Sequence, residues 1–238
     1  MGQRSEWVIH VWGKSRDELE LTDVEKFHID MLKMFQDQQK MFDKIRVHIA
    51  LDDMNDTRLF NFLKDEIDKV IVIKNVEYCF CQNNPELKDL VTFTGNVLDR
   101  IGEDVNVFYS HFKGYGTSFN AEKESYPMRV TKLCEMFWSY LMYRYSLNMD
   151  DVQEKLKDHS VYCWYIPSEQ CPGKFAWYNL KRLKDKDIYN LDDKEYYSLN
   201  GFDDMANLYI HTSIYPSKKI GREFLKDFEK YLIDNELI

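Results

Sequence analysis

The segment NVFYSHFKGYG, residues 106–116, joins a strand-like apolar run to residues that can carry chemistry. His111 can donate a hydrogen bond to an oxyanion or act as a base. Lys113 can place a compact positive charge against a phosphate, and Gly114 lets backbone N–H groups approach it. We interpret the segment as a candidate diphosphate-binding site. The alternative is that His111 only ends the strand and Lys113 is a solvated loop residue.

A second candidate is CPGKFAW, residues 171–177, in which Gly173 and Lys174 precede Phe175 and Trp177. Two aromatic rings on one strand face, beside a backbone free of side chains, form a surface that suits a sugar ring. This segment is therefore a candidate sugar- or acceptor-binding site. The alternative is that both rings belong to the core.

Carboxylates follow another strand-like run, where KIRVHIAL leads into DDMND. Asp52 and Asp53 could hold a divalent ion beside a diphosphate or hydrogen-bond a ribose. The alternative is a polar turn in which Asp56 caps the next helix.

The histidines outside these segments differ in their surroundings. His10 lies inside the apolar run WVIHVW, which is more typical of a core histidine than of a ligand. We expect His28 and His48 at the surface. His211, in YIHTSIYP, follows a strand-like run and is a further candidate.

The elements that must position these residues alternate regularly in the first half of the chain. TDVE, residues 22–25, has the spacing of a capping box, and proline opens a later helix. Periodicity predicts strands over 7–12, 44–51, 70–73 and 105–109, and helices over 22–42, 57–69 and 85–101. This alternation predicts an α/β fold with a mostly parallel central sheet between helices. Ligands bind such sheets at the carboxyl ends of the strands, where Gly13, Asp52 and His111 fall.

The second half is less regular. We expect a helix over 127–145, strands over 160–166 and within KFAWYNL and ANLYIHTSIYP, and a final helix over 220–237. No repeat or linker interrupts the chain, which predicts a single domain over 1–238. Its nucleotide-binding half covers about 1–116, and its acceptor- or sugar-side half covers about 117–238.

Composition limits the function classes. A net charge of −9 disfavours nucleic acid as a partner. Neither a signal core nor an apolar run of about 18 residues is present, so we expect a cytoplasmic protein with at most peripheral membrane association. Five cysteines with a single C-x-C spacing indicate reduced thiols rather than a zinc site. GxGxxG, P-loop, GxSxG and HExxH motifs are absent.

VFYSHFKG resembles the YxHxKG strand end of a family of short glycosyltransferase-like proteins from capsule and surface-glycan gene clusters and some large viruses. VIHVW is similar to its opening strand, MRVTKLCEMFWSYLMY to the following helix, and CPGKFAWYNLKRL to its SGxFxW strand and helix. The resemblance implies a GT-A-like fold and sugar transfer from a nucleotide-sugar donor to a hydroxyl of a glycan or glycolipid. It implies the site residues His10, His111, Lys113, Gly114, Gly173, Phe175 and Trp177.

The sequence departs from this family at two places. GT-A enzymes commonly carry Asp-x-Asp after the fourth strand to bind Mn²⁺ or Mg²⁺, where this chain has SHFKG, so metal dependence stays open. The family's later glutamate is replaced by Asp203 and Asp204, which with His211 are our candidates for the catalytic base. Two alternatives are an inactive nucleotide-binding or adaptor domain of a glycan-assembly complex and, from GKSRDE at 13–18, a nucleotidyltransferase.

Overall fold

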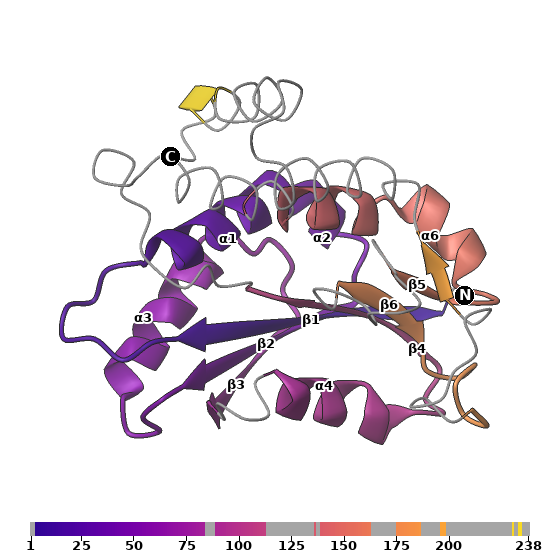
Figure 1. Cartoon of the computed structure of the whole chain (residues 1–238), viewed down its shortest axis with the longest axis horizontal. Helices are drawn as coiled ribbons and strands as arrows, with labels where there is room; N and C mark the ends of the chain where they lie inside the picture. Colours follow the sequence, from indigo (N-terminus) through magenta and orange to yellow (C-terminus); the bar gives the residue numbers. More distant parts are fainter. Residues whose placement is uncertain are drawn as a thin grey trace, which may run out of the picture.

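The structure is a computed structural model that describes residues 3–83, 89–112, 136, 139–162, 175–186, 196–198, 230 and 233–234. These residues form an α/β fold in which helices cover both faces of a mixed sheet (Figure 1). The predicted fold class is confirmed at this level.

Within the described residues the sheet has seven strands in the order β3-β2-β1-β4-β6-β5-β7. β1 pairs in parallel with β2 and β4, β2 with β3, and β5 with β7, while β6 runs antiparallel to β4 and β5. The strands are β1 (Arg4–Gly13), β2 (Lys44–Leu51), β3 (Val76–Gln82), β4 (Val105–His111), β5 (Ser160–Tyr162), β6 (Ala176–Asn179) and β7 (Tyr196–Ser198).

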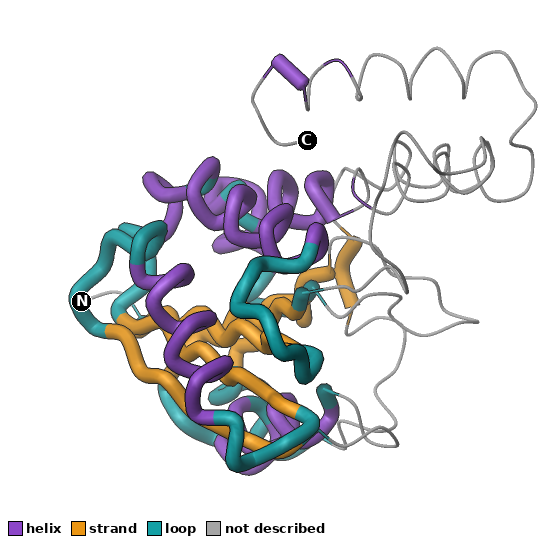
Figure 2. The backbone as a smooth tube through the Cα atoms, turned by 90° about the vertical axis from the view of Figure 1, so that its left-hand side faces the viewer, coloured by secondary structure: helices purple, strands orange, loops and turns teal. Residues whose placement is uncertain are grey.

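Two layers of helices enclose this sheet, as Figure 2 shows from the carboxyl ends of the first strands. One face carries α1 (Asp23–Met34), α2 (Gln36–Gln39), α3 (Thr57–Asp68), helical residues 139–146 and α6 (Met149–Lys155). The other face carries α4 (Leu90–Asn96) and a 3₁₀ helix, Leu98–Arg100. The capping box of α1 is confirmed, because Thr22 Oγ1 accepts from Glu25 N and the Glu25 carboxylate accepts from Thr22 N.

Alternation along the strands divides the core between the two faces. Trp7 and Ile9 point toward α1 and α3, whereas Val8 packs with Val97 and Tyr109 on the α4 face. Every second residue of β1 therefore points to the sheet face that carries α4, and these residues are Glu6, Val8, His10 and Trp12.

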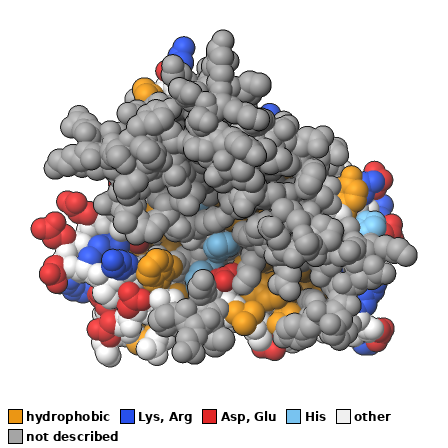
Figure 3. All heavy atoms as spheres, in the orientation of Figure 1, with side chains coloured by type: hydrophobic (Ala, Val, Ile, Leu, Met, Phe, Trp, Pro, Cys, Tyr) orange, Lys and Arg blue, Asp and Glu red, His pale blue; other side chains and the backbone are white. Residues whose placement is uncertain are grey.

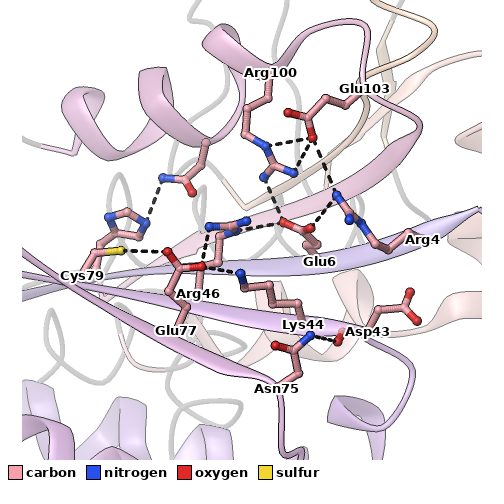
Figure 4. A network of polar contacts seen from close by, with 12 residues as sticks. Arg4, Glu6, Asp43, Lys44, Arg46, Asn75, Glu77, Cys79, Arg100 and Glu103 are labelled. Atoms are coloured by element: carbon pink, nitrogen blue, oxygen red, sulfur yellow. Dashed lines mark hydrogen bonds and ion pairs between the residues drawn. The ribbon is translucent and has the colours of Figure 1, made fainter.

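Glu6 centres a network of charges at the amino end of β1 (Figure 4). Its carboxylate, 1% exposed, lies 2.9 Å from Arg4, 3.0 Å from Arg46 and 2.9 Å from Arg100. Arg46 also contacts Glu77, at 2.6 Å. Burial alone would raise the pKa of Glu6, but hydrogen bonds from Arg100 and Arg46 outweigh it and hold that pKa below its ordinary value.

Two predicted elements differ from the structure. Residues 70–73, VIVI, are not a strand, because the Gln39 side chain donates to Val70 O and accepts from Val72 N. The third strand is instead Val76–Gln82. The helix expected over 85–101 is α4, which begins only at Leu90, followed by the short 3₁₀ turn; residues 84–88 lie outside the described part.

Candidate functional site

The strand order reverses between β1 and β4, which makes this a topological switch point of the sheet. From β1 the chain adds β2 and β3 on one side, with α1 and α3 on one face of the sheet. It then crosses back through α4, on the opposite face, to place β4 on the other side of β1. Open α/β sheets bind ligands at such a point, outside the carboxyl ends of the strands. The candidate site is therefore the carboxyl edge of β1, β2 and β4.

Three histidines form a row across this part of the sheet. His10 in β1 is the register partner of His48 in β2 on one side and of His111 in β4 on the other. The row continues to Cys79 in β3. Register partners share a face, and His10 alternates with the core residue Ile9, so the row lies on the α4 face. We name these three side chains the histidine row.

His10 and His111 are the two members of the row at the switch point. His10 is 6% exposed, and its Nδ1 lies 2.9 Å from Thr92 Oγ1 in α4. His111 is half-buried, with its ring 5.9 Å from that of Phe175. Phe112 N donates to His10 O at 2.8 Å, so the pairing with β1 continues one residue past His111. Figure 3 shows histidine side chains at the surface near the middle of this view.

His48 contacts α4 through the side chain of Asn96. Asn96 Nδ2 donates to Thr92 O at 2.8 Å and lies 2.9 Å from His48 Nε2, which accepts its second hydrogen. Burial, helped by Arg46, lowers the pKa of His48 below 6.5, while the hydrogen bond with Asn96 and the charge of Glu77 oppose this shift. His48 thus serves to anchor α4. The predicted surface position of His28 is wrong: it is fully buried and stacks on Phe112.

Asp52 is the best-placed carboxylate of the edge. It follows β2, is exposed, and accepts hydrogen bonds from Trp12 Nε1 at 3.3 Å and Asn83 Nδ2 at 2.8 Å. These contacts link the ends of β1, β2 and β3, and Trp12 leaves 44% of its surface open to solvent. Asp53 instead accepts from Asn55 N within its own turn.

The neighbouring helix start confirms the cap that we considered as an alternative for this segment. Asp56 Oδ1 accepts from Leu59 N at 3.0 Å at the first turn of α3. This turn therefore combines a structural cap with the exposed Asp52 carboxylate.

Basic residues follow β1 directly. Arg16 makes two hydrogen bonds to the buried Glu25 carboxylate, at 3.0 and 2.9 Å, which neutralises it. Lys14 has an exposed side chain beside the switch point. Our sequence reasoning missed Lys14, Trp12 and Asn83 as site residues. The signal that could have found them is their position at the ends of strands, on either side of Gly13 and directly after Gln82.

Phe175 and Trp177 are core residues, 1% and 0% exposed. The Trp177 ring stacks on Phe108 at 5.2 Å, and its Nε1 donates to Ser146 O at 2.7 Å. The alternative that both rings belong to the core is therefore the one that the structure supports. Phe175 contacts the ring of His111 and, being buried, exposes no ring face to a ligand.

Several predicted site residues lie outside the described part of the chain. They are Lys113, Gly114, Gly173, Lys174, Asp203, Asp204 and His211. Among the residues that the structure describes, no three His, Cys, Asp or Glu side chains are grouped to hold a metal ion. In that same part, no helix has the length and apolar character needed to cross a membrane.

The arrangement thus offers a half-buried imidazole, an exposed indole, a carboxylate and a lysine around one sheet edge. Comparison of the chain with protein-family models, with curated proteins and with solved structures found no match.

Proposed function

We propose that this protein is a glycosyltransferase that moves a sugar from a nucleotide-sugar donor to a hydroxyl group of a glycan or glycolipid. The observation that carries the proposal is that His111 and Asp52 stand at carboxyl ends of strands on both sides of β1. This is where an open α/β sheet receives a nucleotide.

The nucleoside is assigned to Trp12, Asp52 and Asn83. A base can stack on the exposed indole, an interaction typically worth about 1–3 kcal/mol. The Asp52 carboxylate can accept from a base N–H or a ribose hydroxyl, and Asn83 already orients it. This division leaves the diphosphate beside β1 and β4.

The diphosphate is assigned to His111 and Lys113, with Lys14 as a second cation. In sugar transfer the bond between the anomeric carbon and the phosphate oxygen breaks, and negative charge builds on the leaving diphosphate. Fixed donors and positive charges stabilise that charge. A base must also remove the proton of the attacking hydroxyl, and Asp203, Asp204 and His211 remain our candidates for this role.

Donor binding is tested first, by thermal unfolding of the full chain with UDP-, GDP- and CMP-sugars, with and without Mn²⁺. A donor at about 100 times its dissociation constant should add about 2.7 kcal/mol to the free energy of unfolding. Asp52→Asn should weaken that stabilisation, whereas Asp104→Asn, an exposed carboxylate far from the edge, should not. Stabilisation by none of these donors would contradict the proposal.

Transfer is tested with Lys113→Ala. Loss of one electrostatic donor to the leaving group should lower turnover by about 10²–10³, while Lys74→Ala, an exposed lysine in a distant loop, serves as control. Unchanged turnover in Lys113→Ala would remove this residue from the mechanism.

A nucleotide-binding domain without transfer activity is the second candidate. It is favoured because both described carboxylates at this edge already accept hydrogen bonds, so neither stands ready as a catalytic base. Asp52 accepts from Trp12 and Asn83, and Asp53 accepts from the backbone of its own turn. A donor that binds but is neither hydrolysed nor transferred would establish this alternative.

A further inference from the structure

A cavity of about 230 Å³, lined mostly by residues with polar side chains, lies at the opposite end of the sheet from the candidate site. Its floor is a row of side chains across three strands, because Ser5 in β1 pairs with Asn106 in β4, and Asn106 pairs with Asn179 in β6. Gly13 is the eighth residue after Ser5 along β1, a span of roughly 26 Å at about 3.3 Å per residue. The cavity is therefore separate from the carboxyl edge.

Carboxamides dominate the lining of this cavity. Gln3, Asn106 and Asn179 come from the strand side, and Gln153 comes from α6 above them. The remaining lining residues are Ser5, Leu156 and Lys157. Each carboxamide offers two N–H hydrogens and one carbonyl oxygen without a net charge.

Two of the amides are already oriented. Gln3 Nε2 donates to Asn179 Oδ1 at 3.1 Å, and Asn179 Nδ2 returns a longer hydrogen bond to Gln3 Oε1 at 3.4 Å. Arg182 N also donates to Asn179 Oδ1, at 3.2 Å. These contacts hold the amide pair in place before any ligand arrives, which limits the entropy lost on binding.

Asn106 supplies an unused acceptor. Its Oδ1 is buried and has no hydrogen-bond partner among the described residues. A buried polar atom without a partner is costly, typically about 1–3 kcal/mol. Because Asn106 lines the cavity, a reorientation of its carboxamide that let a ligand hydroxyl donate to this oxygen would remove that cost.

We propose that this cavity binds a single neutral sugar ring. Sugar hydroxyls both donate and accept, which matches a lining of carboxamides and serine. Among the described lining residues Lys157 is the one charged side chain, and because it is exposed, solvent and salt screen its charge, so hydrogen bonding by the carboxamides is the main basis for selecting a ligand. The volume is below the roughly 300–1,000 Å³ of pockets for drug-sized ligands, which fits one ring.

The proposal does not depend on the transfer reaction, and its test needs no donor. D-glucose, D-galactose, N-acetyl-D-glucosamine and the charged D-glucuronate are titrated into the ¹⁵N-labelled full chain, and side-chain carboxamide NMR signals are followed. A neutral sugar should shift the signals of Gln3, Asn106, Asn179 and Gln153 to saturation. UDP should leave them unchanged, so failure of nucleotide binding and failure of this site are distinguishable.

Asn106→Ala should weaken sugar binding at least tenfold, whereas Asn61→Ala, an exposed amide of α3, should not change it. Gln153→Ala, at an exposed position of α6, should weaken binding several-fold and provides the test if Asn106→Ala does not fold. Shifts by none of the neutral sugars, unchanged binding in the folded variants, or tenfold tighter binding of glucuronate would each overturn the proposal.

Discussion

At the amino end of β1 the Glu6 side chain is enclosed by three guanidinium groups, whereas at the carboxyl end of the same strand and face Trp12 reaches solvent. Between them lie Val8 and His10. Both ends carry polar chemistry from several strands. At the amino end the charged side chains form ion pairs with one another. At the carboxyl end the Asp52 carboxylate is exposed and accepts hydrogen bonds from two neutral donors, Trp12 and Asn83.

This difference distinguishes polar groups that stabilise the fold, at the amino end, from polar groups that a ligand can contact, at the carboxyl end. Buried charges must be paired or they destabilise the fold, so the Glu6 network is best understood as part of the core. Exposed groups such as Asp52 and Trp12 add little to stability and remain accessible to a ligand. Burial, rather than residue type, therefore distinguishes the two ends.

The largest effect is expected for Glu6→Gln. It removes the buried carboxylate that Arg46 and Arg100 share and leaves them only the more exposed Glu77 and Glu103, and breaking a buried ion pair by removal of one partner typically costs about 3–5 kcal/mol. Urea unfolding measures this loss. Asp104→Asn, which breaks the exposed pair with Lys181, should cost less than about 1 kcal/mol; equal losses in the two variants would show that the amino end is not a buried network.

Gly13→Ala tests how tightly the carboxyl end is packed on the α3 face. A Cβ at Gly13 would lie 2.5 Å from Leu51 Cδ2 and 2.7 Å from Leu63 Cδ1, both in buried side chains. Overpacking of this kind typically costs about 1–3 kcal/mol, measured by urea unfolding.

Gly95→Ala is the matched control, because nothing lies within 4 Å of a Cβ at this position in α4. It should stabilise the protein by about 0.5–1 kcal/mol, since alanine favours a helix over glycine. Destabilisation by both alanines to the same extent would argue against a specific close approach at Gly13.

His48→Gln tests whether the histidine row makes the sheet sensitive to acid. The groups that face His48 are Glu77 and Cys79 of β3, Arg46 of β2, His10 of β1 and the Asn96 amide of α4. Because its pKa is lowered on folding, the unfolded chain binds the proton more readily, and stability falls as the pH drops below about 6.5.

The variant should therefore lose less stability than the natural protein between pH 7.5 and 5.5, and at pH 7.5 it should lie within about 1 kcal/mol of it. Urea unfolding across this pH range measures both quantities. His159→Gln, outside the row, should keep the original pH dependence. An unchanged slope in His48→Gln would mean that another group controls acid sensitivity.

The smallest effect on stability is expected for Asp52→Asn, within about 0.5 kcal/mol, because the side chain is exposed. Its effect on nucleotide-sugar binding should be large by comparison. A stability loss close to that of Glu6→Gln would remove the contrast between the two ends.

Local patterns predicted several elements well. KIRVHIAL alternates as β2 does, TDVE caps α1, and VNVFY is the first part of β4. The pattern wrongly predicted a strand at VIVI, residues 70–73. The backbone of this apolar run forms hydrogen bonds with the side chain of Gln39 instead of with a neighbouring strand. They also left open whether Phe175 and Trp177 face a ligand or the core, since period-2 alternation does not say what covers each face.

The sequence by itself determined the α/β class and the positions of His111, Asp52 and His10 within or after strands, because these follow from local periodicity. Only the tertiary structure decided that His48, His10 and His111 lie side by side and that Trp12 and Asn83 meet at Asp52. Those contacts depend on strand order and register. Strand order and register are set by packing between segments far apart in the chain. Here that packing places β4 beside β1, on the side opposite β2.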